Sequence, residues 1–222
     1  MAENDERQAL RQRLDELEVR ITRACAKAGR QRNEITVVAV TKTTTAEIAG
    51  LLPELGYSDL GESRPQELAR KATALADRGI RWHMIGHLQT NKIVPTIDIA
   101  TLIHSVDRLR LIEELARRQR PVKILLEVNA SREANKHGFA PDEVPGVVEK
   151  LKQFPNLQLE GLMTMAAYTD DPEAARPTFR EVRALRDAMG LKELSMGMSH
   201  DLEVAIEEGT TIIRPGSALF SV

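Results

Sequence analysis

The hydrophobic positions of the chain follow two different spacings, and the first is that of a helix. Near the start, apolar residues recur at steps of three and four, at Leu10, Leu14, Leu17, Ile21 and Cys25. This stripe predicts an amphipathic helix from residue 5 to about residue 28, ending at Gly29.

After this helix, short apolar runs alternate with helical patterns to the end of the chain. The predicted strands lie near residues 35–41, 58–61, 81–85, 99–103, 122–128, 157–163, 193–196 and 211–214. The predicted helices lie near residues 45–55, 64–78, 88–94, 107–118, 141–152, 172–189 and 199–208.

This alternation implies a parallel sheet with right-handed crossovers. Eight strands favour an α/β fold of the closed (β/α)8 TIM barrel type, with an extra N-terminal helix, over an open doubly wound sheet. The weakest strands are 58–61 and 193–196, because Asp59 and Glu193 interrupt their apolar pattern. Losing either strand would favour the open sheet.

Length, charge and cysteine content narrow the class of protein. The chain has 222 residues, near the lower limit for a complete barrel, so we expect one domain over residues 1–222. The net charge of −2 gives no electrostatic reason to expect nucleic acid or an anionic membrane as a partner. No apolar segment approaches a membrane span, the start lacks a signal-peptide pattern, and Cys25 is the only cysteine. We therefore expect a cytoplasmic protein.

Lys42 directly follows the first predicted strand, residues 35–41. Ligands of parallel α/β sheets bind at the carboxyl ends of the strands, so this amine is a candidate reactive group. Partial removal from water would disfavour its charged form and free the lone pair that makes a Schiff base with a carbonyl. The alternative is a solvated surface lysine.

The loops after the last two predicted strands have the composition of a phosphate site. One loop contains Gly197 and Ser199, and the other contains Gly216 and Ser217. In such barrels the backbone N–H groups of these two loops commonly bind phosphate. Glycines allow the phosphate to approach the backbone closely, and serine hydroxyls can donate hydrogen bonds to it. We also expect Ser199 to cap the helix that follows. Ordinary turn chemistry would explain either loop alone.

A reactive amine near a phosphate site suggests pyridoxal 5′-phosphate (PLP), which also needs a group facing its ring nitrogen. Arg214 is a candidate for that role. Its permanent charge would keep the nitrogen unprotonated, so that the ring would be a weak electron sink. A salt bridge across the barrel rim is the other interpretation of Arg214.

Seven stretches resemble, in order, the signatures of the pyridoxal phosphate homeostasis proteins, the YggS or PROSC family. They span nearly the whole chain, at residues 38–42, 61–62, 82–92, 104–107, 161–165, 195–199 and 214–220. The resemblance implies the fold-type III PLP-binding barrel found in the N-terminal domain of alanine racemase. It implies Lys42 as the Schiff-base lysine and Arg214 toward the ring nitrogen. The further candidate cofactor contacts are Ser63, His83, Met198, Ser199, Gly216 and Ser217.

Four positions depart from the family pattern, and one of them is Ser221, where the family usually has a glycine. Ser63 stands where the family usually has an asparagine, and His200 stands where it usually has an aspartate. Pro215 replaces a β-branched residue and removes a backbone N–H beside the predicted phosphate loop. We therefore expect weaker PLP binding than in typical members.

The function most consistent with these residues is that of a carrier or regulator in intracellular PLP homeostasis. Racemase-like enzymes add a tyrosine from a C-terminal β domain, whereas this chain ends soon after Arg214, and only Tyr168 of its two tyrosines follows a strand. We therefore expect no strong catalytic turnover, a monomer, and PLP-dependent apoenzymes as candidate partners. The alternatives are a PLP-dependent racemase-like enzyme, or a Schiff-base aldolase or isomerase acting on a sugar phosphate. Glu62 is the one candidate base for the latter, and a structural hydrogen bond is its other interpretation.

Two further groups complete the predictions. His83 and His87 straddle a strand end and do not share a face, so we predict no metal site. His83 is expected either under the cofactor or as a satisfied core histidine. Lys136 is a second amine in the loop after the fifth strand, expected to be solvated or to accept the aldehyde transiently during cofactor transfer.

Overall fold

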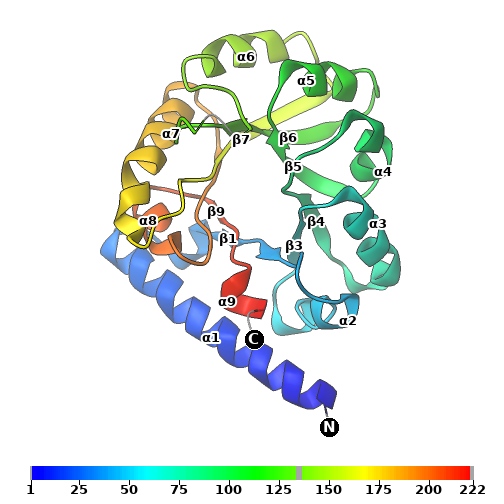
Figure 1. Cartoon of the computed structure of the whole chain (residues 1–222), viewed down its shortest axis with the longest axis vertical. Helices are drawn as coiled ribbons and strands as arrows, with labels where there is room; N and C mark the ends of the chain where they lie inside the picture. The colour runs from blue at the N-terminus through cyan, green and yellow to red at the C-terminus, as the bar shows by residue number, and fades with distance from the viewer. Residues whose placement is uncertain (1, 134–136, 221–222) are drawn as a thin grey trace.

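The strands form one parallel barrel enclosed by helices (Figure 1). The structure, a computed structural model, describes residues 2–133 and 137–220. Within these ranges the strands are β1 (Thr36–Val37), β2 (Ala39–Val40), β3 (Asp59–Glu62), β4 (Arg81–Met84), β5 (Ala100–Val106), β6 (Val122–Val128), β7 (Leu157–Thr164), β8 (Glu193–Ser195) and β9 (Ile212–Ile213).

The barrel closes through its first strand. β1 pairs with β9, β2 pairs with β3, and the two are halves of one extended run interrupted only at Val38. The remaining strands pair in chain order from β3 to β9. The predicted barrel is therefore confirmed over the open sheet, and both weak strands are present as β3 and β8.

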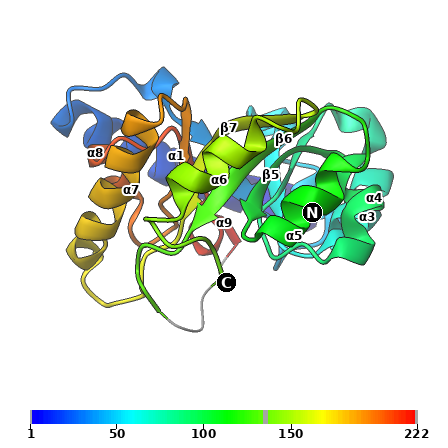
Figure 2. The same cartoon turned by 90° about the horizontal axis from the view of Figure 1, so that it is seen from above.

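The helices surround the strands on the outside of the barrel (Figures 1 and 2). They are α1 (Ala2–Lys27), α2 (Ala46–Ala49), α3 (Pro65–Ala74), α4 (Ile93–Ile97), α5 (Leu109–Ala116), α6 (Val144–Leu151), α7 (Arg176–Ala188), α8 (Leu202–Glu207) and α9 (Ser217–Phe220). Each predicted helix is present, and those after α1 are shorter than expected, largely because several ends are single 3₁₀ turns, as at residues 53–55, 76–78 and 172–175. The final short helix, α9, was not predicted.

α1 lies across the outside of the barrel and contacts α8 and α9 (Figure 1). Its predicted stripe is confirmed, because Leu10, Leu14, Leu17 and Ile21 are all buried. The chain leaves the helix through Gly29, whose φ of +66° is a conformation that glycine adopts at little cost. No helix in the described ranges is long and apolar enough to cross a membrane.

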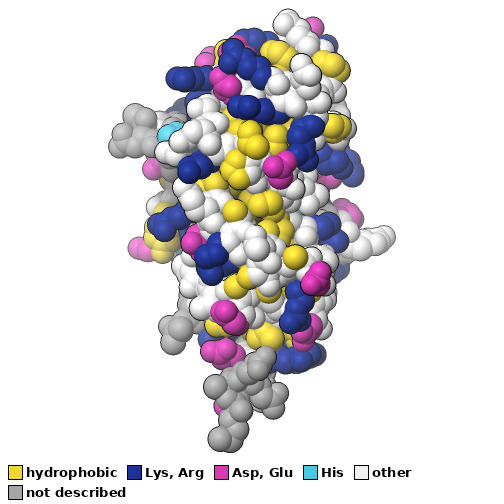
Figure 3. Space-filling view, turned by 90° about the vertical axis from the view of Figure 1, so that its right-hand side faces the viewer, with side chains coloured by type: hydrophobic (Ala, Val, Ile, Leu, Met, Phe, Trp, Pro, Cys, Tyr) yellow, Lys and Arg dark blue, Asp and Glu magenta, His cyan; other side chains and the backbone are white. Residues whose placement is uncertain are grey.

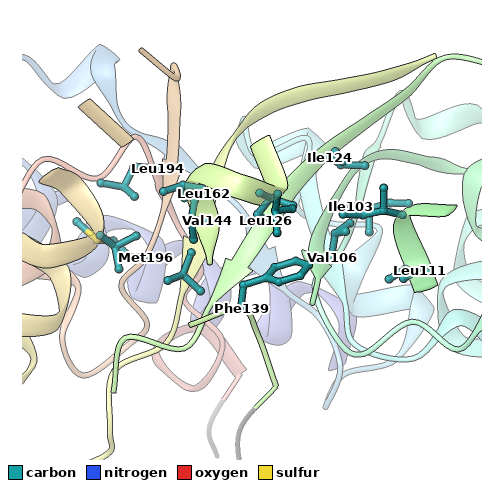
Figure 4. Close-up of a cluster of buried hydrophobic side chains, with 14 of the residues drawn as sticks. Ile103, Val106, Leu111, Ile124, Leu126, Phe139, Val144, Leu162, Leu194 and Met196 are labelled. Carbon is teal, nitrogen blue, oxygen red and sulfur yellow. The ribbon is translucent and has the colours of Figure 1, made fainter. Parts of the chain in front are cut away.

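Side chains alternate between the barrel lumen and the helix layer. On β6, Ile124 and Leu126 belong to the large cluster between strands and helices shown in Figure 4. Leu125, between them, belongs to a second cluster. Five segments around the barrel contribute to this cluster, so the cluster fills the lumen. That inner cluster consists of Val38, Leu102, Leu125, Met163 and Ile212.

The outer surface over α3, α4 and α5 faces the viewer in Figure 3. Hydrophobic side chains form a narrow strip there, bordered by Lys, Arg, Asp and Glu side chains. Val94 of α4 and Leu109 of α5 are large apolar residues exposed on these helices. At the end of the barrel where α9 lies, the loops after β6 and β7 project outward (Figure 2).

The contact between β7 and β8 leaves no room for a side chain at Gly161. A methyl group there would lie 1.8 Å from the carbonyl oxygen of Glu193. We expect Gly161→Ala to lower the free energy of unfolding by about 3 kcal/mol or more, because backbone would have to move. Urea denaturation followed by circular dichroism measures this change.

The matched control is Gly146→Ala in α6, where an added methyl group meets no atom within 4 Å. This change should raise the free energy of unfolding by about 0.5–1 kcal/mol, since alanine is the better helix former. Equal effects of the two substitutions would contradict the packing described for β7 and β8.

Candidate functional site

Lys42 lies just beyond β2, at the C-terminal end of the barrel, where the strands end. Its neighbour Thr41 donates from Oγ1 to Glu62 in the outer layer, 2.6 Å away, whereas Val38 packs in the lumen. The alternation therefore places Lys42 on the inner side of its strand. Its side chain is exposed, so the expectation of an amine partly removed from water is wrong for this structure. No hydrogen bond or ion pair joins the Lys42 side chain to another described residue.

Glu62 points away from the lumen and pairs with Lys71 of α3. Lys71 Nζ lies 2.6 Å from Glu62 Oε1 and donates to the carbonyl oxygen of Thr41 at 2.5 Å. Both charged side chains are only 1% exposed. The structural interpretation of Glu62 is therefore the correct one, and the sugar-phosphate alternative loses the base that the sequence offered it.

Lys71 was not anticipated, although the sequence contains a signal for it. On α3 it follows Leu68 by three residues and precedes Leu75 by four, so it occupies the apolar stripe of the helix. A lysine in such a position needs a buried partner. The pair is incompletely satisfied, because Glu62 Oε2 is buried without a hydrogen-bond partner among the described residues.

The two predicted phosphate loops meet at a pair of backbone N–H groups. Ser199 Oγ accepts hydrogen bonds from Gly216 N at 3.1 Å and from Ala218 N at 2.9 Å. The hydroxyl oxygen thus stands in for an anionic oxygen at the position where two donors converge. From α1, Arg20 donates to the carbonyl oxygen of Ser199 at 2.8 Å and pairs with Glu203, which fixes this loop from outside.

Ser199 does not cap the helix that follows it, which corrects the sequence-based expectation. α8 begins after Asp201, whose carboxylate accepts from Met198 N at 2.7 Å. Asp201 occupies the N-cap position of α8. The Ser199 hydroxyl instead accepts hydrogen bonds from the loop that contains Gly216. Met198 is half-buried, and Ser217 is exposed.

Arg214 is buried in the lumen at the end of β9. Its Nη1 donates to Ser195 Oγ at 2.6 Å, and its Nη2 donates to the carbonyl oxygen of Thr164 at 3.0 Å. Among the described residues no carboxylate forms a salt bridge with it, so the predicted rim salt bridge is not found. Burial lowers the pKa of Arg214 to about 10, although Asp201 and Glu127 act in the opposite direction. The guanidinium therefore remains charged at neutral pH.

His83 is buried in the lumen, in agreement with its interpretation as a satisfied core histidine. Its Nδ1 is 2.9 Å from His104 Nε2, and its Nε2 is 3.0 Å from Asp59 Oδ1. Both ring nitrogens are thus occupied by protein partners. His104 in turn lies 2.9 Å from Ser195 Oγ, the same oxygen that Arg214 contacts. Sequence reasoning did not identify Asp59, His104 or Ser195 as parts of this polar layer.

Glu127 is a second carboxyl group that sequence reasoning missed. It follows Leu125 by two residues on β6, so it faces the lumen, and it is 6% exposed. Burial and the nearby Asp107 raise the pKa of Glu127 to about 7, against the lowering effect of Arg214. The signal was a glutamate inside an otherwise apolar strand.

One group in the described residues has the composition of a metal site, at the ends of β4, β5 and β6. It consists of His87, Asp107 and His137. Asp107 Oδ2 is 2.8 Å from His87 Nδ1 and 3.6 Å from His137 Nδ1, and the two rings stack at 4.3 Å. Stacked rings do not aim two lone pairs at one point, and Arg108 also pairs with Asp107. The shared carboxylate accounts for these contacts, and we assign no ion.

The structure brings Lys42, Ser199, Arg214 and Gly216 together at the C-terminal ends of neighbouring strands, because β8, β9 and β1–β2 are adjacent. Ser63 follows β3 at the same end. It is half-buried against Gly86, where a methyl group would lie 2.3 Å from the Ser63 carbonyl oxygen. Lys136 lies outside the described residues.

Comparisons with known proteins show relatives that match nearly the whole chain. The family described as "Alanine racemase, N-terminal domain" matches residues 12–222. A "Pyridoxal phosphate homeostasis protein" of Aquifex aeolicus is 41% identical over 219 residues, covering 94% of this chain and 96% of that protein.

Two solved structures extend the comparison to three dimensions. An unknown protein from Bifidobacterium adolescentis superposes with a TM-score of 0.91 at 34% identity, over 97% of this chain and 96% of that one. PipY of Synechococcus elongatus, solved with PLP bound, gives a TM-score of 0.83 at 28% identity, over 96% of this chain and 100% of that one.

The buried pair of Lys71 and Glu62 generates a stability prediction. Lys71→Met should lower the free energy of unfolding by about 3–5 kcal/mol, because it leaves the Glu62 carboxylate buried without its counter-charge. The double variant Lys71→Met/Glu62→Leu should recover most of this loss, since no charge then remains buried. Urea denaturation of the three proteins measures both changes. A double variant no more stable than the single one would argue against an ion pair.

Glu127 generates a prediction about pH. Its pKa is raised from 4.5 in the unfolded chain to about 7, so folding favours its protonated form. The resulting stabilisation is complete below the unfolded pKa and is lost as pH rises through about 7. Relative to the wild type, Glu127→Gln should therefore gain on the order of 2 kcal/mol of unfolding free energy between about pH 5 and about pH 8.

Urea denaturation at several pH values measures this difference. The control is Glu149→Gln in α6, which removes an exposed carboxylate whose side chain is 72% exposed. Its difference from the wild type should not change over the same interval. A flat difference for Glu127→Gln as well would show that the carboxyl group does not titrate there.

Proposed function

The chain belongs to the family of the pyridoxal phosphate homeostasis proteins, and on this premise we propose that it binds PLP and takes part in PLP homeostasis. The observation that carries the proposal is the convergence of a free amine, an anion cradle and a buried cation at one end of the barrel. These are Lys42, the N–H groups now bound to Ser199 Oγ, and Arg214.

The described residues fit the reactive parts of PLP. Gly216 and Ala218 would donate their backbone N–H groups to the phosphate, beside the hydroxyls of Ser199 and Ser217. Arg214 would face the ring nitrogen and keep it unprotonated, since its guanidinium is charged at neutral pH. When bound, the cofactor supplies an aldehyde carbon to which an amine adds with loss of water, forming a Schiff base, and Lys42 would provide that amine.

The other candidate contacts have different positions. Ser63 and Met198 are half-buried near the C-terminal end of the barrel, where they would contact the ring or its substituents. His83 would support the site from deeper in the lumen without a hydrogen bond to the cofactor, because both its ring nitrogens already have protein partners. The weaker binding expected from Ser63 and Pro215 is part of the same proposal.

We assign the chain a carrier or regulatory role without strong turnover, because its tyrosines are poorly placed for acid–base chemistry. Tyr57 donates to Glu18 of α1 at 2.5 Å, on the outside of the barrel. Tyr168 is 81% exposed and lies beside His200, with ring centroids 5.6 Å apart.

The remaining parts of the proposal concern the cellular setting. The proposal includes transfer of PLP to apoenzymes by a monomeric protein in the cytoplasm. A reducing compartment suits the single cysteine, Cys25, which is buried and has no disulfide. A lysine that is exposed and has no partner among the described residues suits reversible loading better than a closed active site would.

Borohydride trapping tests the assignment of Lys42. The protein is loaded with PLP and reduced, and the modified lysine is identified by peptide mass mapping. We expect the adduct on Lys42, with loss of the visible absorbance of the bound cofactor on reduction. Lys42→Arg should abolish the adduct, whereas Lys123→Arg, which changes an exposed lysine on β6, should not.

No adduct on Lys42 in folded protein with excess PLP would overturn the proposal. If the adduct forms, assays with free amino acids separate the two remaining functions. Sustained racemisation that depends on Tyr168 would favour the enzyme, and its absence would favour the carrier.

A further inference from the structure

A continuous line of hydrogen bonds crosses the lumen from the N-terminal end of the barrel to Arg214. It begins at Asp59, the first residue of β3, and continues through His83 on β4 and His104 on β5. Ser195 on β8 then joins His104 to Arg214. The four distances are 3.0, 2.9, 2.9 and 2.6 Å.

The chemistry of the two ends, together with the charge state of His104, determines the direction of the hydrogen bonds in this line. The guanidinium of Arg214 can only donate, so Ser195 Oγ accepts from it. At the other end, the carboxylate of Asp59 can only accept, so His83 donates from Nε2. Burial lowers the pKa of His104 well below its usual value, and the charge of Arg214 lowers it further, so this ring is neutral.

With His104 neutral, one arrangement satisfies every atom. His83 carries its proton on Nε2 and accepts at Nδ1. His104 therefore donates from Nε2 and accepts at Nδ1, which leaves the hydroxyl of Ser195 to donate to it. All four hydrogen bonds then run from Arg214 toward Asp59, through two neutral histidines in the same tautomer.

Asp59 is held firmly at its end of the line. Arg81 donates to it from Nε at 2.8 Å and also from Nη2. Burial alone would raise the pKa of Asp59, but the hydrogen bonds from His83 and Arg81 outweigh it and lower the pKa to about 2. The carboxylate is therefore ionised at physiological pH, and it is joined to Arg214 only through neutral groups.

We propose that Asp59 is a positioning residue of the cofactor site, which fixes the orientation of the Arg214 guanidinium through His83, His104 and Ser195. The part of this inference that concerns PLP rests on the proposed function, whereas the hydrogen-bond direction does not. The carbonyl oxygen of Thr164 is the other acceptor for Arg214. Ser195 is therefore the contact through which Asp59, at the N-terminal end of the barrel, acts on the guanidinium.

An asparagine at position 59 has no arrangement that keeps all these bonds. If its oxygen faced His83, its amide would face the donating Nη2 of Arg81. If its amide faced His83, both histidines would have to reverse, and the Ser195 hydroxyl would lose its acceptor. Asp59→Asn should therefore either give His83 a weaker, uncharged acceptor and lose a contact with Arg81, or reverse both rings, without changing the volume of the side chain.

Long-range ¹⁵N NMR spectra of the histidine rings in the PLP-free protein test the direction of the line. In the wild type, His83 and His104 should both be neutral with the proton on Nε2. Asp59→Asn should shift the ¹⁵N signals of the rings, because His83 then has an uncharged acceptor or both rings are reversed. The control, Asp98→Asn, removes an exposed aspartate that pairs with Arg120 at the same end of the barrel, and it should leave both rings unchanged.

The wild-type spectrum is decisive even if Asp59→Asn fails to fold. A charged ring, or a proton on Nδ1 of either histidine, would overturn the inference. Unchanged ring ¹⁵N signals in a folded Asp59→Asn protein would overturn it as well.

Titration with PLP, followed by absorbance, tests the link to the cofactor. We expect Asp59→Asn to weaken PLP binding about tenfold and to shift the absorbance maximum of the bound cofactor, whereas Asp98→Asn should match the wild type. Failure of the wild type to bind PLP would remove the proposed function and leave the hydrogen-bond direction intact. Normal binding and an unshifted spectrum in Asp59→Asn would remove the positioning role and leave the proposed function intact.

Discussion

Closure of the barrel through residues 36–40 is the constraint on which the rest of the structure depends. This run pairs with β9 along its first half and with β3 along its second. Because of that double pairing, Lys42 becomes a neighbour of loops that follow it by more than 150 positions in the sequence. An open sheet would have separated the amine from the anion cradle, and the candidate site would not exist.

The closed lumen imposes a second requirement, because polar groups inside it must find partners there. Part of the lumen is apolar and is filled by Leu102, Leu125 and Met163. Beside them, five polar side chains satisfy one another in a line from Asp59 to Arg214. These hydrogen bonds satisfy the buried polar groups and also determine where the Arg214 guanidinium lies. The same contacts therefore serve both the stability of the fold and the geometry of the site.

The sequence was sufficient to predict the barrel, because eight apolar runs of strand length are a strong signal. It was less informative where polar residues are buried. Asp59 made β3 look weak, yet its carboxylate is partnered by His83 and Arg81. Periodicity treats a polar residue as evidence against burial and contains no information about its partner. Lys71 was missed for the same reason, and the direction of Glu62 depends on a one-residue alternation that the pattern at a strand end does not fix.

The hydroxyl of Ser199 gives the anion cradle a property that an empty cavity would lack. Two N–H donors are already satisfied by this neutral oxygen, so a phosphate bound here as proposed would have to displace it. Binding would then exchange one acceptor for another, and its driving force would be only the difference between a charged and an uncharged partner. Release would be correspondingly easy, because the serine would restore both hydrogen bonds as the anion leaves. Such a site can bind and release its ligand without leaving the backbone N–H groups without a hydrogen-bond acceptor.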